Sequence, residues 1–379
     1  MNRKYKESRK LWEEVFQEDT PEFLDYYDQC VADHNRIYGD EEKGEFVSML
    51  HMNPYCVQAG KKTAQVSYIV AVATKKEFRH QGRMRKLLKK ALTDSYENEE
   101  PFAFLMPASE AIYRPFGFRT VRWQDVIALG GPFQSKQNGG EISCRYAKKE
   151  QIPQLAAFSQ QILERHCGVF TKRDTGYYER IWKEQEAVNG GILLLYHKED
   201  LCGYCFTGQE DGNEIWELVV ESRAEAPVSE KARDYAKAVQ AVTDVFGESG
   251  PIKIRGLLPG AVVEGISPKE ISWRPITMVR IVNLAAFAQL LRAKEEIELC
   301  LRVQDDLLEE NSGCYRLCID REGGRLTKLS DREYEKKSET IVPITVEELT
   351  DVFFGLHEMK GIPSSGLQIL HPVYFNELV

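Results

Sequence analysis

The stretch from Val66 to Leu92 constrains the fold of this chain more than any other. It opens with an apolar, β-branched run over 66–73, which predicts a buried strand. A basic loop containing one glycine, Gly82, follows over 74–83. Apolar residues then recur at i, i+3, i+4, i+7 and i+8 from Met84, which predicts an amphipathic helix. We therefore expect a strand, a basic glycine-containing loop and a helix in succession.

This succession favours an anion-binding site at the start of the helix. The first turn of a helix has backbone N–H groups without a partner in the helix, and the helix dipole adds partial positive charge. Gly82 lets a ligand approach the backbone, because glycine has no Cβ. Arg79, His80 and Arg83 add donors or charge, so a pyrophosphate suits the loop. From spacing alone, an ordinary strand-to-helix connection with surface charge is an equal alternative.

A second apolar strand is expected at Phe102–Met106, followed by the segment Pro-Ala-Ser-Glu-Ala-Ile-Tyr-Arg-Pro-Phe-Gly-Phe over 107–118. Its tyrosine, Tyr113, carries a phenol whose ordinary pKa is ~10, so it is a good donor to a developing thiolate. The alternative is that Tyr113 is a half-buried packing residue.

Three segments resemble a known family. Residues 79–84, Arg-His-Gln-Gly-Arg-Met, resemble the R/Q-x-x-G-x-G/A motif of the GNAT acetyltransferase superfamily, with Met84 in place of the final Gly or Ala. Ser109–Phe118 resembles the S-E-x-x-I-Y-x-x-F-G-F segment of the enhanced-intracellular-survival (Eis-like) branch. The tail Asn376–Val379 is similar to the N-E-hydrophobic-hydrophobic tail of that branch.

The resemblance implies a fold and a chemistry. The fold would be α/β (α+β), with tandem GNAT domains, the second degenerate, and a C-terminal sterol-carrier-protein-like domain. The chain would be an N-acetyltransferase that uses acetyl-CoA as co-substrate and needs no metal. The implied cofactor-binding residues are Val72, Ala73, Thr74, Arg79, His80, Gln81, Gly82, Arg83, Met84 and Ser109.

The resemblance also implies catalytic roles and partners. Tyr113 would be the general acid that protonates the leaving CoA thiolate. The terminal carboxylate of Val379 would assist deprotonation of the acceptor amine. The acceptor would be a primary amine of a cationic small molecule, aminoglycoside- or polyamine-like, or a lysine. Relatives assemble as trimer-based hexamers, so a homo-oligomer is expected.

A chain of 379 residues predicts two or three domains. Breaker clusters at 130–132 and 137–140 place the first boundary, which gives expected domains at 1–135, 136–277 and 278–379. The central part repeats the order helix, meander, helix. The turn after Val220 lacks a glycine cradle, however, and Pro227 removes an N–H. We therefore expect the central domain to be structural and to bind no cofactor.

Other elements follow from periodicity and turn residues. In the first domain, helices are expected at 10–16 and 21–31, short strands at 46–50 and 55–59 with a turn at Asn53-Pro54, and a strand at 121–129. In the central part, strands are expected at 142–146, 192–196, 201–207 and 215–220, with helices at 151–165 and 230–246. In the last part, a strand is expected near 278–283, a helix at 284–292 and strands at 297–303 and 314–320. A capping box at Thr345–Glu348 predicts one more helix.

Charge and cysteine content narrow the partners. The formal net charge of −9 argues against nucleic acid and favours cationic ligands. The acidic residues between Glu22 and Glu42 are either a solvated face or a rim that attracts a cationic acceptor. No apolar run approaches the ~18 residues that span a bilayer. Nine scattered cysteines suit reduced thiols in a cytoplasm, and Cys202 and Cys205 are expected as strand residues without a metal.

Two other functions fit the same sequence. One is a non-catalytic CoA-binding sensor, in which Met84 marks a weakened site. The other is a lipid-binding module, suggested by the expected C-terminal domain. Release of free thiol with an amine, or lipid that copurifies with the protein, would tell them apart from an enzyme.

Overall fold

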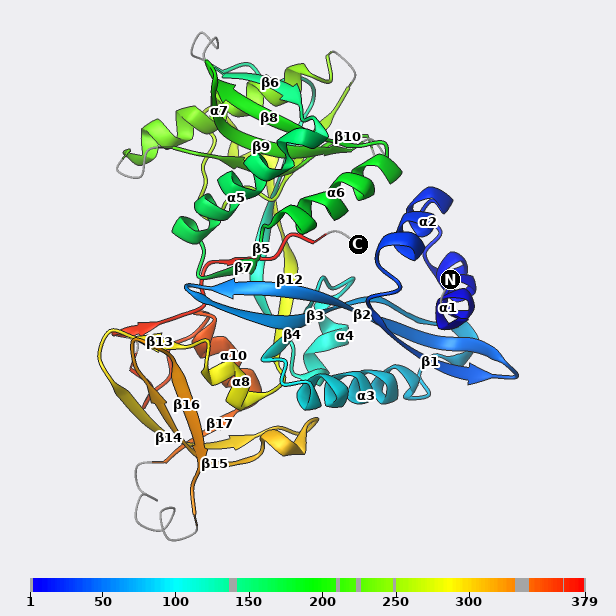
Figure 1. Ribbon diagram of the computed structural model, residues 1–379, viewed down its shortest axis with the longest axis vertical. Coiled ribbons are helices and arrows are strands. Elements are labelled where there is room, and N and C mark those ends of the chain that lie inside the picture. Colours follow the sequence, from blue (N-terminus) through cyan, green and yellow to red (C-terminus); the bar gives the residue numbers. More distant parts are fainter. Residues whose placement is uncertain are drawn as a thin grey trace.

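The computed structural model describes residues 3–135, 142–208, 212–222, 226–247, 250–330, 341–363 and 365–377. It is a mixed α/β structure with an N-terminal unit, a central unit and a C-terminal domain (Figure 1). The N-terminal unit contains α1 (Arg3–Val15), α2 (Pro21–Cys30), β1 (Arg36–Glu42), β2 (Glu45–Ala59), β3 (Lys62–Thr74), α3 (Arg83–Glu97), β4 (Phe102–Leu105), α4 (Glu110–Tyr113) and β5 (Arg119–Leu129).

The central unit repeats the helix and meander order. It contains β6 (Ile142–Tyr146), α5 (Ile152–His166), β7 (Val169–Thr171), α6 (Thr175–Ala187), β8 (Gly191–His197), β9 (Asp200–Gly208), β10 (Asn213–Val220), α7 (Val228–Asp244) and β11 (Ile252–Arg255). The predicted strands and helices of this unit are confirmed, while β7, α6 and β11 were not predicted. Cys202 and Cys205 lie on β9 as expected, and all nine cysteines are free.

One sheet runs through both units. Its described strand order is β19-β7-β2-β3-β4-β12-β5-β11-β10-β9-β8-β6, with β1 paired to β2. The long strand β12 (Ile271–Ile281) lies between β4 and β5 of the N-terminal unit, and β5 pairs on its other edge with β11 of the central unit. The expected boundary between residues 277 and 278 falls inside this continuous strand.

The prediction of a turn at Asn53-Pro54 is wrong. These residues lie inside β2, opposite Tyr68 and Ser67 of β3. On its other edge β2 pairs with β1 as far as Met52 and with β7 from Val57. Pro54 stands in the gap between these two neighbours, where its missing N–H removes no ladder hydrogen bond. A residue pair typical of a turn is therefore accommodated in a strand of 15 residues.

In the N-terminal unit, helix α3 covers one face of the sheet and helices α1 and α2 cover the other. On one face, Leu87, Leu88, Ala91 and Leu92 of α3 are buried, as their spacing predicted. On the other face, α1 and α2 pack through residues such as Trp12 and Tyr27. Thr20 caps α2 and Pro21 occupies its first turn, which confirms the predicted start. The first helix is longer than expected and begins at Arg3.

The C-terminal domain has a four-stranded sheet of its own. Its order is β16-β15-β14-β17. The elements after β12 are α8 (Leu284–Ala288), β13 (Arg292–Ala293), β14 (Ile297–Gln304), β15 (Gly313–Ile319), β16 (Gly324–Lys328), β17 (Val342–Thr345), α10 (Val346–Phe353), β18 (Leu367–Gln368) and β19 (Val373–Tyr374). The predicted capping box at Thr345 and Glu348 is present. The helix expected over 284–292 ends at Ala288, because Arg292 and Ala293 pair with β18.

The last described residues return to the sheet. Strand β19 pairs in parallel with β7, and Figure 1 shows this red segment crossing between the central and N-terminal units. The Tyr374 hydroxyl donates to the Gly256 carbonyl at 2.9 Å, and Phe375 packs against Phe102 and Phe104. The tail therefore forms part of the core. In the described part of the chain, no helix has the length and apolar character to cross a membrane.

A buried ion pair joins the shared sheet to the C-terminal domain. Arg280 of β12 donates to both carboxylate oxygens of Asp305, at 2.6 and 2.8 Å, and to the Phe116 carbonyl at 2.8 Å. Both side chains are 1% exposed.

We predict that Asp305→Ala lowers the free energy of unfolding by about 3–5 kcal/mol, because it leaves the Arg280 charge buried without its partner. Denaturant titration measures the change. Asp306→Ala, at the exposed neighbour, is the control and should change stability by less than about 0.5 kcal/mol. Equal, small effects of the two substitutions would contradict the prediction.

Candidate active site

The N-terminal unit has an opening between β3 and β4. These strands pair only over Ser67–Ile69 and Ala103–Leu105, whereas β3 continues to Thr74. The register between β2 and β3 shifts near Ala71, which has a positive φ of 50°. Among the described strands, none pairs with residues 70–74 on the β4 side, so backbone groups there are available to a ligand.

The basic loop after β3 ends at the start of α3, as predicted. Gly82 is the N-cap of this helix with φ 76°, a conformation that glycine adopts readily. A Cβ built at Gly82 would meet no atom within 4 Å, so space lies directly in front of the backbone. Arg79 and His80 are exposed, and Arg79 donates its Nε–H to the Thr74 carbonyl at 3.0 Å. The remaining guanidinium nitrogens of Arg79 lie in the exposed part of the loop.

Arg83 is bound by carboxylates of β1. Its guanidinium contacts Asp40 at 2.7 Å and Glu42 at 2.6 Å, and it lies over the Phe78 ring. Lys86 also contacts Asp40, at 3.2 Å. What Arg83 offers at the helix start is therefore its backbone N–H. These ion pairs also neutralise part of the acidic stretch from Glu22 to Glu42.

Tyr113 lies on the α3 face of β3. It is buried in a cluster that includes Ile69, Leu105 and Phe118, with Val72 and Met84 packed against it. Burial raises the pKa of Tyr113 to about 12, so the phenol stays protonated at neutral pH. Both readings of Tyr113 from sequence, packing residue and proton donor, are compatible with this position.

The remaining predicted cofactor contacts occupy two places. Val72, Ala73 and Thr74 form the end of β3 that extends beyond its pairing with β4, and Ser109 is exposed at the start of α4, where its hydroxyl caps no backbone N–H. Gln81 is exposed and donates to the Glu77 carbonyl at 3.1 Å. Residues 72–74 and 79–84 therefore lie around one end of β3 and the start of α3. Val379 lies outside the described residues.

A cavity of about 630 Å³ lies on the other face of β3. It reaches the opening at Ala71 on β3 and at Met106-Pro107-Ala108 after β4. Its remaining lining comes from the first helices and from the central unit and β12: Trp12, Phe16, Glu18, Asp19, Phe23, Tyr68, Glu184, Val188, Trp216, Arg255, Arg274 and Ile276. The cavity is therefore built by both units.

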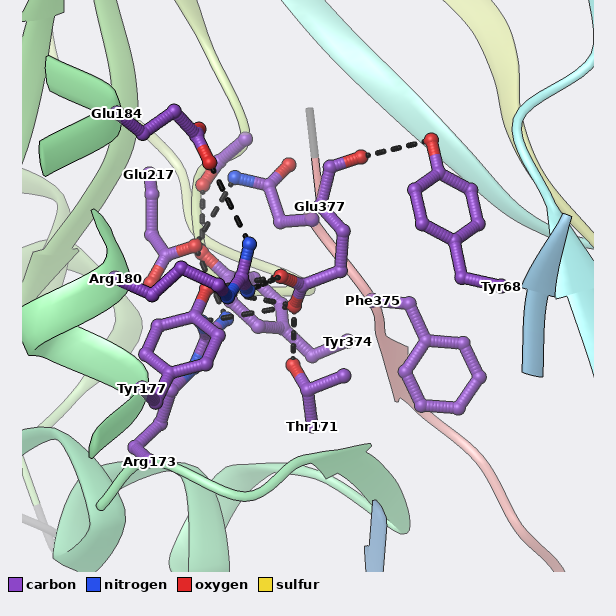
Figure 2. A network of polar contacts seen from close by, with 12 residues as sticks. Tyr68, Thr171, Arg173, Tyr177, Arg180, Glu184, Glu217, Tyr374, Phe375 and Glu377 are labelled. Carbon is purple, nitrogen blue, oxygen red and sulfur yellow. Dashed lines mark hydrogen bonds and ion pairs between the residues drawn. The ribbon is translucent and has the colours of Figure 1, made fainter. Parts of the chain in front are cut away.

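Figure 2 shows a buried network of charged groups, of which Glu184 also lines the cavity. Arg173 contacts Glu217 at 3.1 Å and Glu377 at 3.7 Å, and all three side chains are fully buried. Arg180 contacts Glu377 and Glu184, each at 3.5 Å. Two guanidinium groups therefore face three carboxylates.

Glu377 connects the tail to both units. Its carboxylate accepts hydrogen bonds from the Thr171 hydroxyl at 2.5 Å and the Tyr177 hydroxyl at 3.1 Å. Its backbone carbonyl accepts from the Tyr68 hydroxyl at 3.2 Å, and Tyr68 lines the cavity. Figure 2 shows Tyr68 and the charged groups on opposite sides of the Glu377 backbone.

Glu184 is the member of the network that also lines the cavity. The Tyr26 hydroxyl donates to it at 3.1 Å. Burial raises the pKa of Glu184 to about 7, although the Arg180 guanidinium opposes this rise. Sequence reasoning missed Glu184, Arg173 and Glu217, because helix α6 was not predicted and nothing local marks these charges as buried.

The comparisons with known proteins agree with this geometry. Residues 2–121 match the family model described as "Acetyltransferase (GNAT) domain". The chain contains a GNAT acetyltransferase domain. Residues 283–362 match the model described as "Sterol carrier protein domain". The resemblance inferred from residues 79–84 and 109–118 is thereby confirmed at the level of the superfamily, and with it the acetyltransferase activity and the C-terminal domain type.

Solved structures share the whole fold. A probable N-acyltransferase from Enterococcus faecalis V583 superposes with a TM-score of 0.74 at 17% identity, over 94% of this chain and 88% of that one. A GCN5-related N-acetyltransferase from Anabaena variabilis gives 0.70 at 17%, over 93% and 87%. Eis1 from Mycobacterium abscessus gives 0.59 at 17%, over 94% and 88%. A search of curated proteins found no significant sequence match.

The residues at the start of α3 fit acetyl-CoA, which GNAT domains use. The space over Gly82 would admit a phosphate to the first-turn N–H groups of a 15-residue helix. In the central unit, the corresponding helix α7 begins after Pro227, which has no N–H. Among the described residues, no group of His, Cys, Asp or Glu is arranged to hold a metal ion.

We predict that Gly82→Pro abolishes acetyl-CoA binding, because proline cannot adopt φ 76° and would project into the space over the loop. Calorimetry on the intact chain should show one site per wild-type chain and none in the variant.

The matched control is Gly366→Pro. Gly366, just before β18 in the C-terminal domain, has φ 89° and equally open surroundings. Its substitution imposes a similar backbone strain away from α3, so acetyl-CoA affinity should be retained. Two sites per wild-type chain, or equal loss in both variants, would show that the binding site has been misplaced.

Proposed function

We propose that this GNAT enzyme transfers an acetyl group from acetyl-CoA to a primary amine held in the 630 Å³ cavity. The observation that supports this most is that the opening between β3 and β4 has the anion site on one side and the cavity on the other. The acceptor is a cationic small molecule, aminoglycoside- or polyamine-like, or a lysine. Glu18, Asp19 and Glu184 in the lining supply the carboxylates that such an amine needs.

The residues of the anion site hold and orient the donor. Acetyl-CoA supplies the acetyl thioester when it is bound. The N–H groups at the start of α3 and the exposed Arg79 would bind the pyrophosphate, with His80, Gln81 and Ser109 near the same ligand. Backbone groups of Val72–Thr74 on the side facing away from β2 would bind the pantetheine arm, and an N–H there would donate to the thioester carbonyl oxygen.

Tyr113 would return a proton to the leaving thiolate. It is buried beside Val72, and its raised pKa keeps the proton available. No covalent bond between the enzyme and the acetyl group is needed, because the neutral amine can attack the thioester directly.

The amine must lose a proton before it attacks. The carboxylate of Val379 would hold the ammonium or a water molecule that takes the proton. Glu377, two residues earlier, lies against Tyr68 of the cavity, which supports this role. Assembly of the protein as a homo-oligomer also stays a prediction.

We predict that Tyr113→Phe lowers kcat by roughly 10²–10⁴-fold while acetyl-CoA affinity is retained, since only the proton donor is lost. Thiol release with an accepted amine measures kcat. Tyr38→Phe is the matched control: Tyr38 belongs to the same cluster, but its hydroxyl donates to Asp94 at 2.8 Å. If Tyr113→Phe turns over like Tyr38→Phe, the residue serves packing alone.

We also predict that a few residues appended after Val379 remove most acetyl transfer, because they displace the carboxylate and leave every side chain present. Tm and acetyl-CoA binding should hardly change. Appending the same residues before Met1 is the control and should leave activity intact. Normal activity of the C-terminally extended enzyme would exclude a role for the carboxylate.

A further inference from the structure

The cavity that would hold the acceptor has charges of both signs. Glu18 and Asp19, which follow α1, and Glu184 on α6 contribute carboxylates. Arg255 on β11 and Arg274 on β12 contribute guanidinium groups. An amine by itself would be bound by the first set and repelled by the second. The two arginines therefore need a separate explanation.

Around the two arginines of the cavity, one carboxylate is shared between two positive groups. Glu214 of β10 contacts Arg255 and also Lys253, the latter at 3.7 Å. Among the described residues, Arg274 has no carboxylate within 4.0 Å, and its Nε and Nη2 donate instead to the neutral Gln124 amide oxygen, at 3.3 and 3.0 Å. Burial and the charge of Arg255 lower the pKa of Arg274, and the Glu214 carboxylate opposes this change. The cavity therefore presents a guanidinium group that, within the described part of the chain, is hydrogen-bonded to a neutral amide and not to a carboxylate.

Hydrogen bonds outside the cavity lining hold Arg274 in place. The Gln124 amide donates its N–H to the Asn376 side-chain oxygen at 3.1 Å, which turns the Gln124 oxygen toward Arg274. Asn376 in turn donates to Glu217 at 3.1 Å. The hydrogen bonds to Gln124 use Nε and Nη2 of Arg274, so Nη1 remains to bind a ligand. A guanidinium held in this way is suited to a carboxylate, which it binds with charge-assisted hydrogen bonds.

We propose that the acceptor carries a carboxylate in addition to its primary amine, as an amino acid does. Arg274 binds the carboxylate, with Arg255 beside it, and Glu184 faces the amine. This proposal rests on the proposed function and narrows its substrate class: a diamine with no acidic group provides no carboxylate to bind Arg274. A cavity of about 630 Å³ has room for such an acceptor beside the acetyl group.

The test compares acceptors that differ only in the carboxylate. L-Lysine and cadaverine share the same carbon chain and two amines, and L-ornithine and putrescine form a second pair. Thiol release from acetyl-CoA by the full chain gives kcat/KM for each. We expect the amino acid to exceed its diamine at least 10-fold in both pairs. Equal values, or preference for the diamine, would overturn the proposal.

Arg274→Gln tests the residue. It should lower kcat/KM for the amino acid at least 10-fold, through a higher KM, and leave the diamine unchanged or improved. Arg302→Gln, at an exposed residue of the C-terminal domain, is the control and should change neither. An equal loss for both members of a pair in Arg274→Gln would make Arg274 structural and overturn its role. Release of no thiol with any amine, despite bound acetyl-CoA, would refute the proposed function and the narrower proposal with it.

Discussion

The contact of Arg173 with Glu217 and Glu377 holds three parts of the molecule in one arrangement. Arg173 stands between β7 and α6, Glu217 lies on β10, and Glu377 ends the described tail. Each charge is fully buried, so removal of one partner leaves another without compensation, which is strongly unfavourable. The cavity depends on this contact, because the same tail positions Tyr68 directly and Arg274 through Asn376 and Gln124.

Strand β3 separates two kinds of chemistry. Residues such as Ile69 and Val72 face α3 and Tyr113, in an apolar cluster. Tyr68 and Ala71 face the cavity, where charged groups of both units meet. The register shift at Ala71 and the end of β4 pairing open the sheet at this point. The two faces of one strand thereby border an apolar environment and a charged one.

Local patterns predicted the parts of the fold that depend on nearby residues. The strand, glycine loop and helix from Val66 to Leu92 have regular periodicity, and the structure has them as expected. Helix α6 was not predicted because two of its five buried residues, Glu184 and Gln185, are polar, which weakens the apolar periodicity. The Asn53-Pro54 turn failed because the neighbours of β2 come from distant parts of the chain.

The residues of the candidate site also fall into two groups, those that local motifs predicted and those that only the fold brings together. Gly82 and Tyr113 belong to contiguous motifs, so the sequence alone indicated them. Glu184, Arg255 and Arg274 come from three separate elements and meet only in the folded chain. No spacing rule links them, because their proximity depends on the order of strands in the shared sheet.

The parallel pairing of β19 with β7 affects the order in which parts of the protein can fold during synthesis. During synthesis, the basic loop at 79–84 leaves the ribosome long before Val373 and Tyr374 are made. Until then β7 lacks its outer neighbour, and the Arg173 charge has one of its two carboxylates missing. A nascent chain can thus form the start of α3 early, whereas the cavity gains its support from the tail only after residues 373–377 have been made. Chains that stop before Val373 therefore lack this support of the cavity.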